Sequence, residues 1–255
     1  AHLLARYGDA PHGVLSAKKR LLLVVGSLRM GGIANALAAL LRKIAAEYEI
    51  SLLVMDGGWT SSIPASVRRL TPPGLLRAAE TPLSSLKTLP FPARAFRVLG
   101  AAFVKLFGKR LPFAAACRCH RLTESFDAAV SFCQPSPSRS FCNISNEFVL
   151  YGCEAARKLT FLHGDFLNYG GNTAQNRRLY RRFDHICAVS ESTACRFLSV
   201  MPALADRVSV VRNQIDASRI FSMAAVSVEL AVRACPAIIS VCRLAPEKGL
   251  LRCVP

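Results

Sequence analysis

The sequence of 255 residues has no long apolar run. A membrane-spanning helix needs about 18–20 consecutive apolar residues, and no segment approaches that length without charged residues. Lys18, Lys19 and Arg20 precede the apolar run Leu21–Val25, a pattern that faintly resembles a signal peptide. The run is too short, however, and a glycine loop follows in place of a cleavage site. The sequence therefore predicts a cytoplasmic protein, with residues 1–17 as a tail.

Acidic residues are also few. The chain has 16 Asp and Glu against 33 Lys and Arg, which gives a formal net charge of +17. Such a field attracts anions in general: nucleic acid, acidic phospholipid or phosphorylated small molecules. The sequence contains no recognised nucleic-acid-binding motif and no sheet pattern of alternating basic and aromatic residues. Nucleic acid is therefore the least favoured of these partners.

The ten cysteines have no spacing that indicates a disulfide framework or a metal site. Cys133, Cys187 and Cys242 lie in apolar, strand-like runs, where a thiol behaves as a small hydrophobic group. The cluster Cys117–His120 lacks the second pair of ligands that a metal site usually needs. We therefore expect reduced thiols, no metal and no bound cofactor.

Strand-like runs alternate with helical periodicity along the chain. Leu21–Val25 is followed by a glycine turn, by apolar residues at helical spacing from Ile33 to Ile44, and by a second apolar run, Ile50–Met55. Further strands are expected at 128–132, 159–162, 185–189, 208–211 and 238–241, and helices at 94–109, near 148, and at 174–183, 191–200 and 217–232. Residues 59–92 are rich in Pro and Ser and give no clear assignment. This alternation predicts an α/β fold with a doubly wound, Rossmann-like parallel sheet.

Polar residues follow the predicted strands, at the edge where open parallel sheets bind ligands. Gly31 and Gly32 leave the backbone open at a helix N-terminus, where free N–H groups favour a phosphate. A plain tight turn explains these glycines equally well, and their spacing is not G-x-G-x-x-G. The other residues expected at this edge are His163, Asp165, Ser190, Glu191, Asn213 and Asp216.

Three of these residues have strong structural alternatives. A lone histidine is more often structural than functional, although His163 directly follows a strand and precedes Gly and Asp. Ser190 and Glu191 are the residue types expected to cap a helix and to begin its first turn. Both interpretations stay open for these residues.

Taken in order, these segments resemble the GT-B glycosyltransferases, specifically the large retaining family 4 and its polysaccharide-assembling members. Gln214 and Cys242 stand where that family commonly has glycine. The resemblance implies an acceptor-side, N-terminal Rossmann-like domain over residues 18–216, followed by a linker helix and the truncated start of the donor domain over residues 217–255. The segments that carry the resemblance are Gly31–Gly32, Phe126–Asp127, His163–Asp165, Ala188–Glu191, Asn213–Asp216 and Val241–Gly249.

The resemblance also implies a reaction, the transfer of a sugar from a nucleotide-sugar donor to a carbohydrate or lipid-linked acceptor without a metal. It assigns Arg243 and Lys248 to the donor diphosphate, where two cations offset the charge that grows on the leaving group. It places Gly31 and Gly32 near the donor phosphates or the acceptor, and His163 near the reaction centre. Because the family's paired-glutamate element lies beyond Pro255, we expect this chain alone to be an inactive fragment. The alternatives are a non-catalytic fragment that binds acceptor or membrane, and a basic nucleic-acid-binding module.

The segment Arg94–Lys109 has the pattern of an interfacial helix. On a helical wheel its cations share one side, opposite Phe96, Leu99, Phe103, Leu106 and Phe107, with Val98 as the exception. Lys and Arg opposite Phe and Leu predict peripheral binding to anionic lipid on the inner face of the cell membrane. An ordinary helix that packs its apolar side on the sheet is the alternative. The cations concerned are Arg94, Arg97, Lys105 and Lys109.

Overall fold

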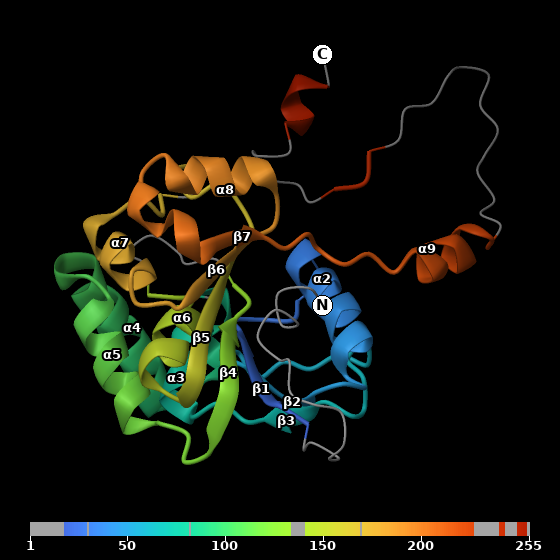
Figure 1. Cartoon of the computed structure of the whole chain (residues 1–255). Helices are drawn as coiled ribbons and strands as arrows, with labels where there is room; N and C mark the ends of the chain where they lie inside the picture. Colours follow the sequence, from blue (N-terminus) through green and yellow to red (C-terminus); the bar gives the residue numbers. More distant parts are fainter. Residues whose placement is uncertain are drawn as a thin grey trace. The chain divides into compact units, whose positions relative to one another are not determined.

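The computed structural model describes residues 18–29, 31–81, 83–133, 141–168, 170–226, 240–242 and 249–253 (Figure 1). The chain divides into two compact units, Ala1–Ile215 and Asp216–Pro255. In the part of the chain that is described, no helix is long and apolar enough to cross a membrane.

The first unit is built on a seven-stranded parallel sheet in the order β3-β2-β1-β4-β5-β6-β7 (Figure 1). The chain runs from β1 outward to β3, then returns to the other side of β1 and continues from β4 to β7. The sheet is therefore doubly wound, as predicted, and its topological switch point lies between β1 and β4. The strands are β1 (Arg20–Val25), β2 (Glu49–Val54), β3 (Arg68–Leu70), β4 (Ser125–Ser131), β5 (Glu154–Leu162), β6 (His185–Ala188) and β7 (Val208–Val210).

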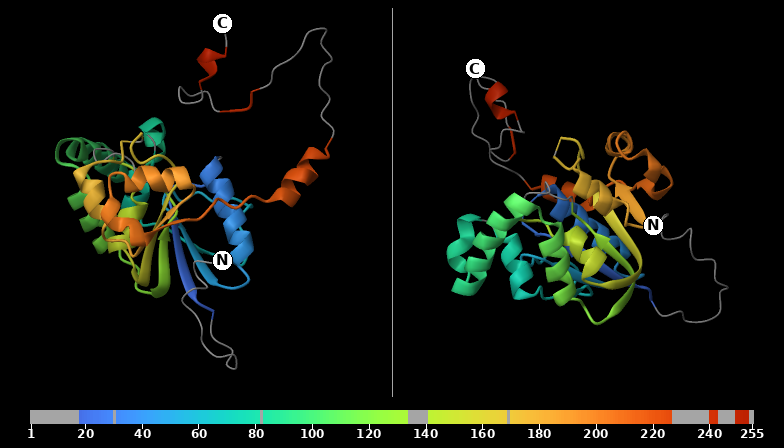
Figure 2. Two further views of the ribbon diagram at one scale, coloured as in Figure 1. Left: turned by 45° about the horizontal axis from the view of Figure 1, so that its top comes forward. Right: turned by 90° about the vertical axis from the view of Figure 1, so that its left-hand side faces the viewer.

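Helices cover both faces of the sheet (Figure 2). Successive residues of a strand point to opposite faces, so Leu23 packs with Leu37 on one face while Leu22 packs in the core that contains Phe113 and Phe148 on the other. The first face carries α2 (Gly32–Ile44). The opposite face carries α3 (Gly74–Glu80), the turn η1 (Leu83–Thr88), α4 (Phe91–Phe107), α5 (Arg110–Cys119), α6 (Ser145–Tyr151) and α7 (Ala174–Tyr180), and the last strands are flanked by α8 (Glu191–Leu198) and η2 (Pro202–Arg207).

Most predicted elements of this unit are confirmed to within a few residues. The sequence did not predict β3, α3 and η1, which occupy the Pro- and Ser-rich stretch 59–92, nor α5. The predicted helix 94–109 ends earlier, at Gly108, whose φ of 80° lies in the left-handed region that favours glycine. A new helix, α5, then begins at Arg110.

The prediction that the four cations of Arg94–Lys109 form one exposed basic face is wrong for two of them. Arg97 is buried, donates from Nε to the carbonyl oxygen of Thr81 (3.0 Å) and lies over the ring of Phe141. Lys109 is fully buried, with Nζ 3.5 Å from Oε1 of the buried Glu147. Both cations turn inward toward buried acidic groups, Glu80 and Glu147, whereas most of the apolar side chains of α4 other than Phe96 and Val104 are exposed.

The second unit is described only in short segments. It contains α9 (Ala217–Ala224) and the turn η4 (Leu250–Arg252). Ser240 and Val241 do not form the predicted strand, and Val241 is 94% exposed. A strand needs a hydrogen-bonded neighbour, and none is present among the described residues of this unit. The rest of that predicted strand, together with Arg243 and Lys248, lies outside the described residues.

Candidate functional site

The candidate site lies at the carboxyl ends of β1, β4 and β5, beside the switch point of the sheet. The loop after β1 begins at Gly26, where a Cβ would lie 3.5 Å from Oε2 of Glu80 and 3.8 Å from Sγ of Cys133. Glu80 ends α3 and Cys133 follows β4, so three separate segments converge on this loop. Crevices at such points are where open α/β sheets bind ligands.

His163 directly follows β5 and packs against aromatic rings on this edge. Its ring centroid is 4.5 Å from that of Phe132, edge to face, and 5.5 Å from that of Phe161, nearly parallel. No described residue hydrogen-bonds to either of its buried ring nitrogens. Burial lowers the pKa of His163 from 6.5 to about 4, so the imidazole is neutral at pH 7. A neutral ring with one free donor and one free acceptor can bind a hydroxyl group.

The N-terminus of α2 is open, as expected from its two glycines. Gly31 precedes the helix in an extended conformation and has no side chain to cap it. A Cβ at Gly32 would meet nothing within 4 Å. The first N–H groups of this helix are therefore accessible to a negatively charged or hydroxyl oxygen.

Asp165 and Ser190 are engaged in local structure. Burial raises the pKa of Asp165, but hydrogen bonds from the Leu167 N–H (2.9 Å), from Nε of Arg196 (3.0 Å) and from the Asn168 N–H outweigh it, so the pKa is lowered. Ser190 accepts a hydrogen bond from the N–H of Thr193 (3.2 Å) and caps α8. These contacts fit the interpretation of Ser190 as a helix cap, and they hold the Asp165 carboxylate in a local turn and an ion pair.

The remaining candidates are spread more widely. Glu191 is exposed in the first turn of α8. Asn213 is exposed, and its neighbour Gln214 accepts a hydrogen bond from Nζ of Lys43 on α2 (3.2 Å). Asp216 belongs to the second unit, where its carboxylate accepts from the N–H of Arg219 (3.1 Å) and caps α9.

Glu80 is the site residue that sequence reasoning missed. Its Oε1 accepts a hydrogen bond from the N–H of Ile144 (2.6 Å). Desolvation raises its pKa and outweighs the opposing effects of the Ile144 and Asn143 N–H groups and of the Lys109 charge. Carboxyl groups with a raised pKa often lie in functional sites. One signal was available: Glu80 is the only acidic residue between positions 57 and 123.

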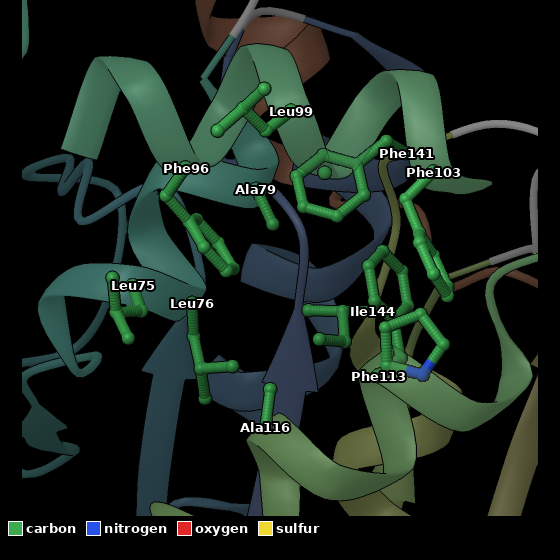
Figure 3. Close-up of a pocket in the computed structure, with 12 residues that line it drawn as sticks. Leu75, Leu76, Ala79, Phe96, Leu99, Phe103, Phe113, Ala116, Phe141 and Ile144 are labelled. Carbon is green, nitrogen blue, oxygen red and sulfur yellow. The ribbon is translucent and has the colours of Figure 1, made fainter. Parts of the chain in front are cut away.

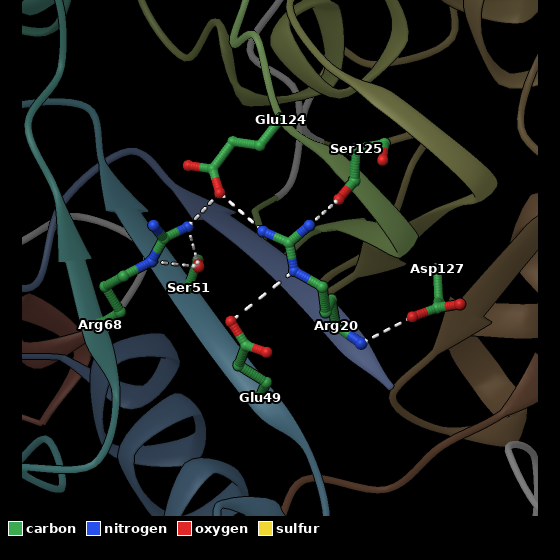
Figure 4. Close-up of polar contacts among 7 residues, drawn as sticks. All are labelled: Arg20, Glu49, Ser51, Arg68, Glu124, Ser125 and Asp127. Carbon is green, nitrogen blue, oxygen red and sulfur yellow. Dashed lines mark hydrogen bonds and ion pairs between the residues drawn. The ribbon is translucent and has the colours of Figure 1, made fainter. Parts of the chain in front are cut away.

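A second polar cluster lies at the opposite, amino-terminal edge of the sheet (Figure 4). The carboxylate of Glu124 accepts from Arg20 (2.7 Å) and from Arg68 (2.6 Å), and the backbone N–H of Arg20 donates to Asp127 (2.7 Å). Hydrogen bonding from Arg68 is the largest cause that lowers the pKa of Glu124, although burial opposes it. These contacts join the starts of β1, β3 and β4 and form a structural clamp away from the candidate site.

No group of three or more His, Cys, Asp or Glu side chains suited to a metal ion occurs among the described residues. Cys117 is buried and Cys119 exposed on α5.

The fold defines a Rossmann-like α/β protein, and comparison with known proteins adds a distant similarity. No family model and no curated protein matches the sequence. Among solved structures, the chain is similar to an alpha-glucosyltransferase in complex with UDP-glucose and DNA containing an abasic site, with a TM-score of 0.44 and 13% identity. It is also similar to an alpha-glucosyltransferase in complex with UDP and a 13-mer DNA, with a TM-score of 0.43 and 11% identity. Each similarity covers 81% of this chain and 45% of the other, so the chain spans less than half the length of these structures.

Proposed function

We propose that this chain is the acceptor-side half of a retaining, family 4-like glycosyltransferase with the GT-B fold. Such an enzyme transfers a sugar from a nucleotide-sugar donor to a carbohydrate or lipid-linked acceptor of polysaccharide assembly, at the cytoplasmic face of the membrane. The observation that carries the proposal is His163, a neutral imidazole with both nitrogens unpartnered among the described residues, which follows β5 beside the switch point of a doubly wound sheet. Buried polar atoms without partners call for an explanation, and a sugar hydroxyl supplies one.

In this proposal His163 orients a sugar hydroxyl by hydrogen bonding and contributes no positive charge. The negative charge that develops on the leaving diphosphate must then be offset elsewhere. We assign that role to Arg243 and Lys248 of the second unit, and we assign the open N–H groups at Gly31 and Gly32 to a donor phosphate or to the acceptor.

The test is a titration of histidine-labelled protein followed by the imidazole signals in NMR. The chain has five histidines, and His163→Gln assigns the signal of interest. We expect a nucleotide sugar or an oligosaccharide to shift the His163 signal saturably, and His163→Ala to weaken that binding about tenfold, as for a lost buried hydrogen bond. Transfer by the full-length protein should fall in parallel.

His185 provides the matched control. It is a partly buried histidine whose pKa is also lowered by burial, but it starts β6 at the opposite edge of the sheet and is hydrogen-bonded to Ser209 (2.8 Å). His185→Gln should leave the titration unchanged. A His163 signal that responds to no sugar ligand contradicts the proposal, and a response to a DNA oligonucleotide instead would favour a nucleic-acid-binding module.

A further inference from the structure

Seven large apolar side chains are exposed on α4 and at the start of α5. These side chains are 47–77% exposed, and two of the rings stack on one another with centroids 4.8 Å apart. Large apolar side chains that gather on one exposed face often mark a binding surface. We call this the α4 surface; it consists of Phe91, Val98, Leu99, Phe103, Leu106, Phe107 and Leu111.

An apolar groove opens beside this surface, between α3, α4 and α5 (Figure 3). Its volume is about 340 Å³ and its lining is almost entirely carbon. Leu99 and Phe103 belong both to the α4 surface and to the groove, and the rings of Phe96, Phe113 and Phe141 lie around its interior. The groove thus extends the exposed apolar area toward the core.

The charged residues of the segment that forms this surface are all basic. No acidic residue occurs from position 81 to 123, whereas Lys87, Arg94, Lys105 and Arg110 are exposed there. At about 100° per residue, Arg94 and Lys105 fall together at one border of the exposed face of α4, beside Val98. The two cations that turn inward, Arg97 and Lys109, lie near the acidic groups of the core and do not belong to this border.

We propose that the α4 surface docks on an anionic phospholipid bilayer. The Phe and Leu side chains would enter the boundary between headgroups and acyl chains, while the bordering cations contact the headgroups. A bilayer accounts for both the exposed apolar side chains and the bordering cations, because its apolar acyl chains lie beneath a layer of negatively charged headgroups. The proposal does not depend on glycosyl transfer, and it replaces the predicted basic face by an apolar face with a basic border.

The first experiment is co-sedimentation with vesicles of phosphatidylcholine alone or mixed with phosphatidylglycerol. We expect binding to the mixed vesicles, and a loss of about tenfold or more in affinity for Leu106→Ser with Phe107→Ser, because buried apolar area drives insertion. Ile215→Ser is the matched control: Ile215 is 74% exposed, as Phe107 is 73%, but it follows β7 away from this surface. It should sediment as the parent does.

Charge-reversal variants test whether the bordering cations contribute to binding of anionic vesicles. Arg94→Glu with Lys105→Glu should weaken binding to the mixed vesicles, whereas two reversals at exposed arginines of other helices, Arg178→Glu and Arg42→Glu, make the same change in net charge and should weaken it much less. Equal losses in both pairs would mean that only the overall charge attracts the protein, which overturns the proposal.

Insertion depth distinguishes a bilayer from other occupants. The chain has a single tryptophan, Trp59, so Trp59→Phe with Phe107→Trp places one fluorophore on the α4 surface. We expect a blue shift and quenching by brominated acyl chains on addition of mixed vesicles. No quenching, or a dimer in solution that Leu106→Ser with Phe107→Ser converts to a monomer, would show that lipid is not the occupant.

Discussion

At the scale of single residues, His163 shows how burial sets chemistry. Its ring packs against Phe132 and Phe161, and none of the described carboxylates offsets the effect of burial on its pKa. The ring therefore remains neutral where a solvent-exposed histidine would be half protonated. Glu80, near the same edge, shows the same effect on an acid, since burial favours its neutral form.

The lowered pKa of His163 predicts a pH dependence of stability. In the unfolded chain the group takes up its proton near pH 6.5, but in the folded protein only near pH 4. Between these values the unfolded state binds more protons, so stability is greatest above pH 6.5 and falls as the pH drops, by up to about 3 kcal/mol from this group.

Urea unfolding of the parent and of His163→Phe between pH 7 and pH 4.5 checks this prediction. The variant keeps the ring stack but cannot bind a proton, so its free energy of unfolding should fall less with acid. The difference between the two proteins isolates His163 from His185, whose pKa is also lowered. Parallel pH profiles for the two proteins would rule the effect out.

At the scale of helices and strands, the sequence was sufficient to predict most strands, but not which side of α4 faces the core. β1, β2 and the end of β5 are buried apolar runs, a local pattern that a parallel sheet imposes. The inward side of α4 depends on groups contributed from elsewhere, such as Thr81 and Glu80, so the helix's own periodicity could not reveal it. The short edge strand β3 has two exposed arginines in three residues and carries no apolar signal.

The buried Lys109–Glu147 pair gives a prediction for this layer of helices. Lys109→Met leaves Glu147 as a buried carboxylate without its ammonium partner, and such changes cost about 3–5 kcal/mol. Lys105→Met, four positions earlier and exposed, should change stability by less than about 0.5 kcal/mol. Denaturant unfolding measures both.

A second substitution shows whether the loss of stability comes from the broken ion pair or from altered packing. Adding Glu147→Gln to Lys109→Met removes the stranded charge and should restore part of the lost stability. If the double variant is no more stable than Lys109→Met alone, the ion pair is not the source of the effect.

At the scale of the whole molecule, the sequence predicted the fold, but it named only some of the residues that the fold brings to the candidate site. His163 could be placed because it directly follows a strand, and the glycines because they lie between β1 and the helix that follows it. Ser190 could not be distinguished from a helix cap, and the ion pair of Asp165 with Arg196 could not be foreseen, until their contacts were known. Glu80 follows no strand, and the chain brings it to Gly26 only through the packing of α3.

The proposed role of Arg243 and Lys248 in binding the donor diphosphate predicts how substitutions at these residues affect sugar transfer. In the full-length protein, Arg243→Ala and Lys248→Ala should each lower kcat/KM for sugar transfer about 10²-fold, because each removes a cation from the diphosphate. Arg243→Lys should also lower it, since lysine lacks the planar guanidinium fork. Arg252→Ala, just beyond these positions, is the control. Near-parental rates in both alanine variants would place the donor elsewhere.

The clamp of Arg20, Glu124 and Asp127 joins residues that are up to 107 positions apart in the chain. The central pairing of β1 with β4 must therefore wait for a long loop to close, whereas β1, α2 and β2 assemble from neighbouring sequence. Pulse-labelled hydrogen exchange should find β2 amides protected before those of β4. During synthesis, β1 would then remain an open strand edge until about half of the chain has emerged, and that interval is when the protein is most exposed to aggregation.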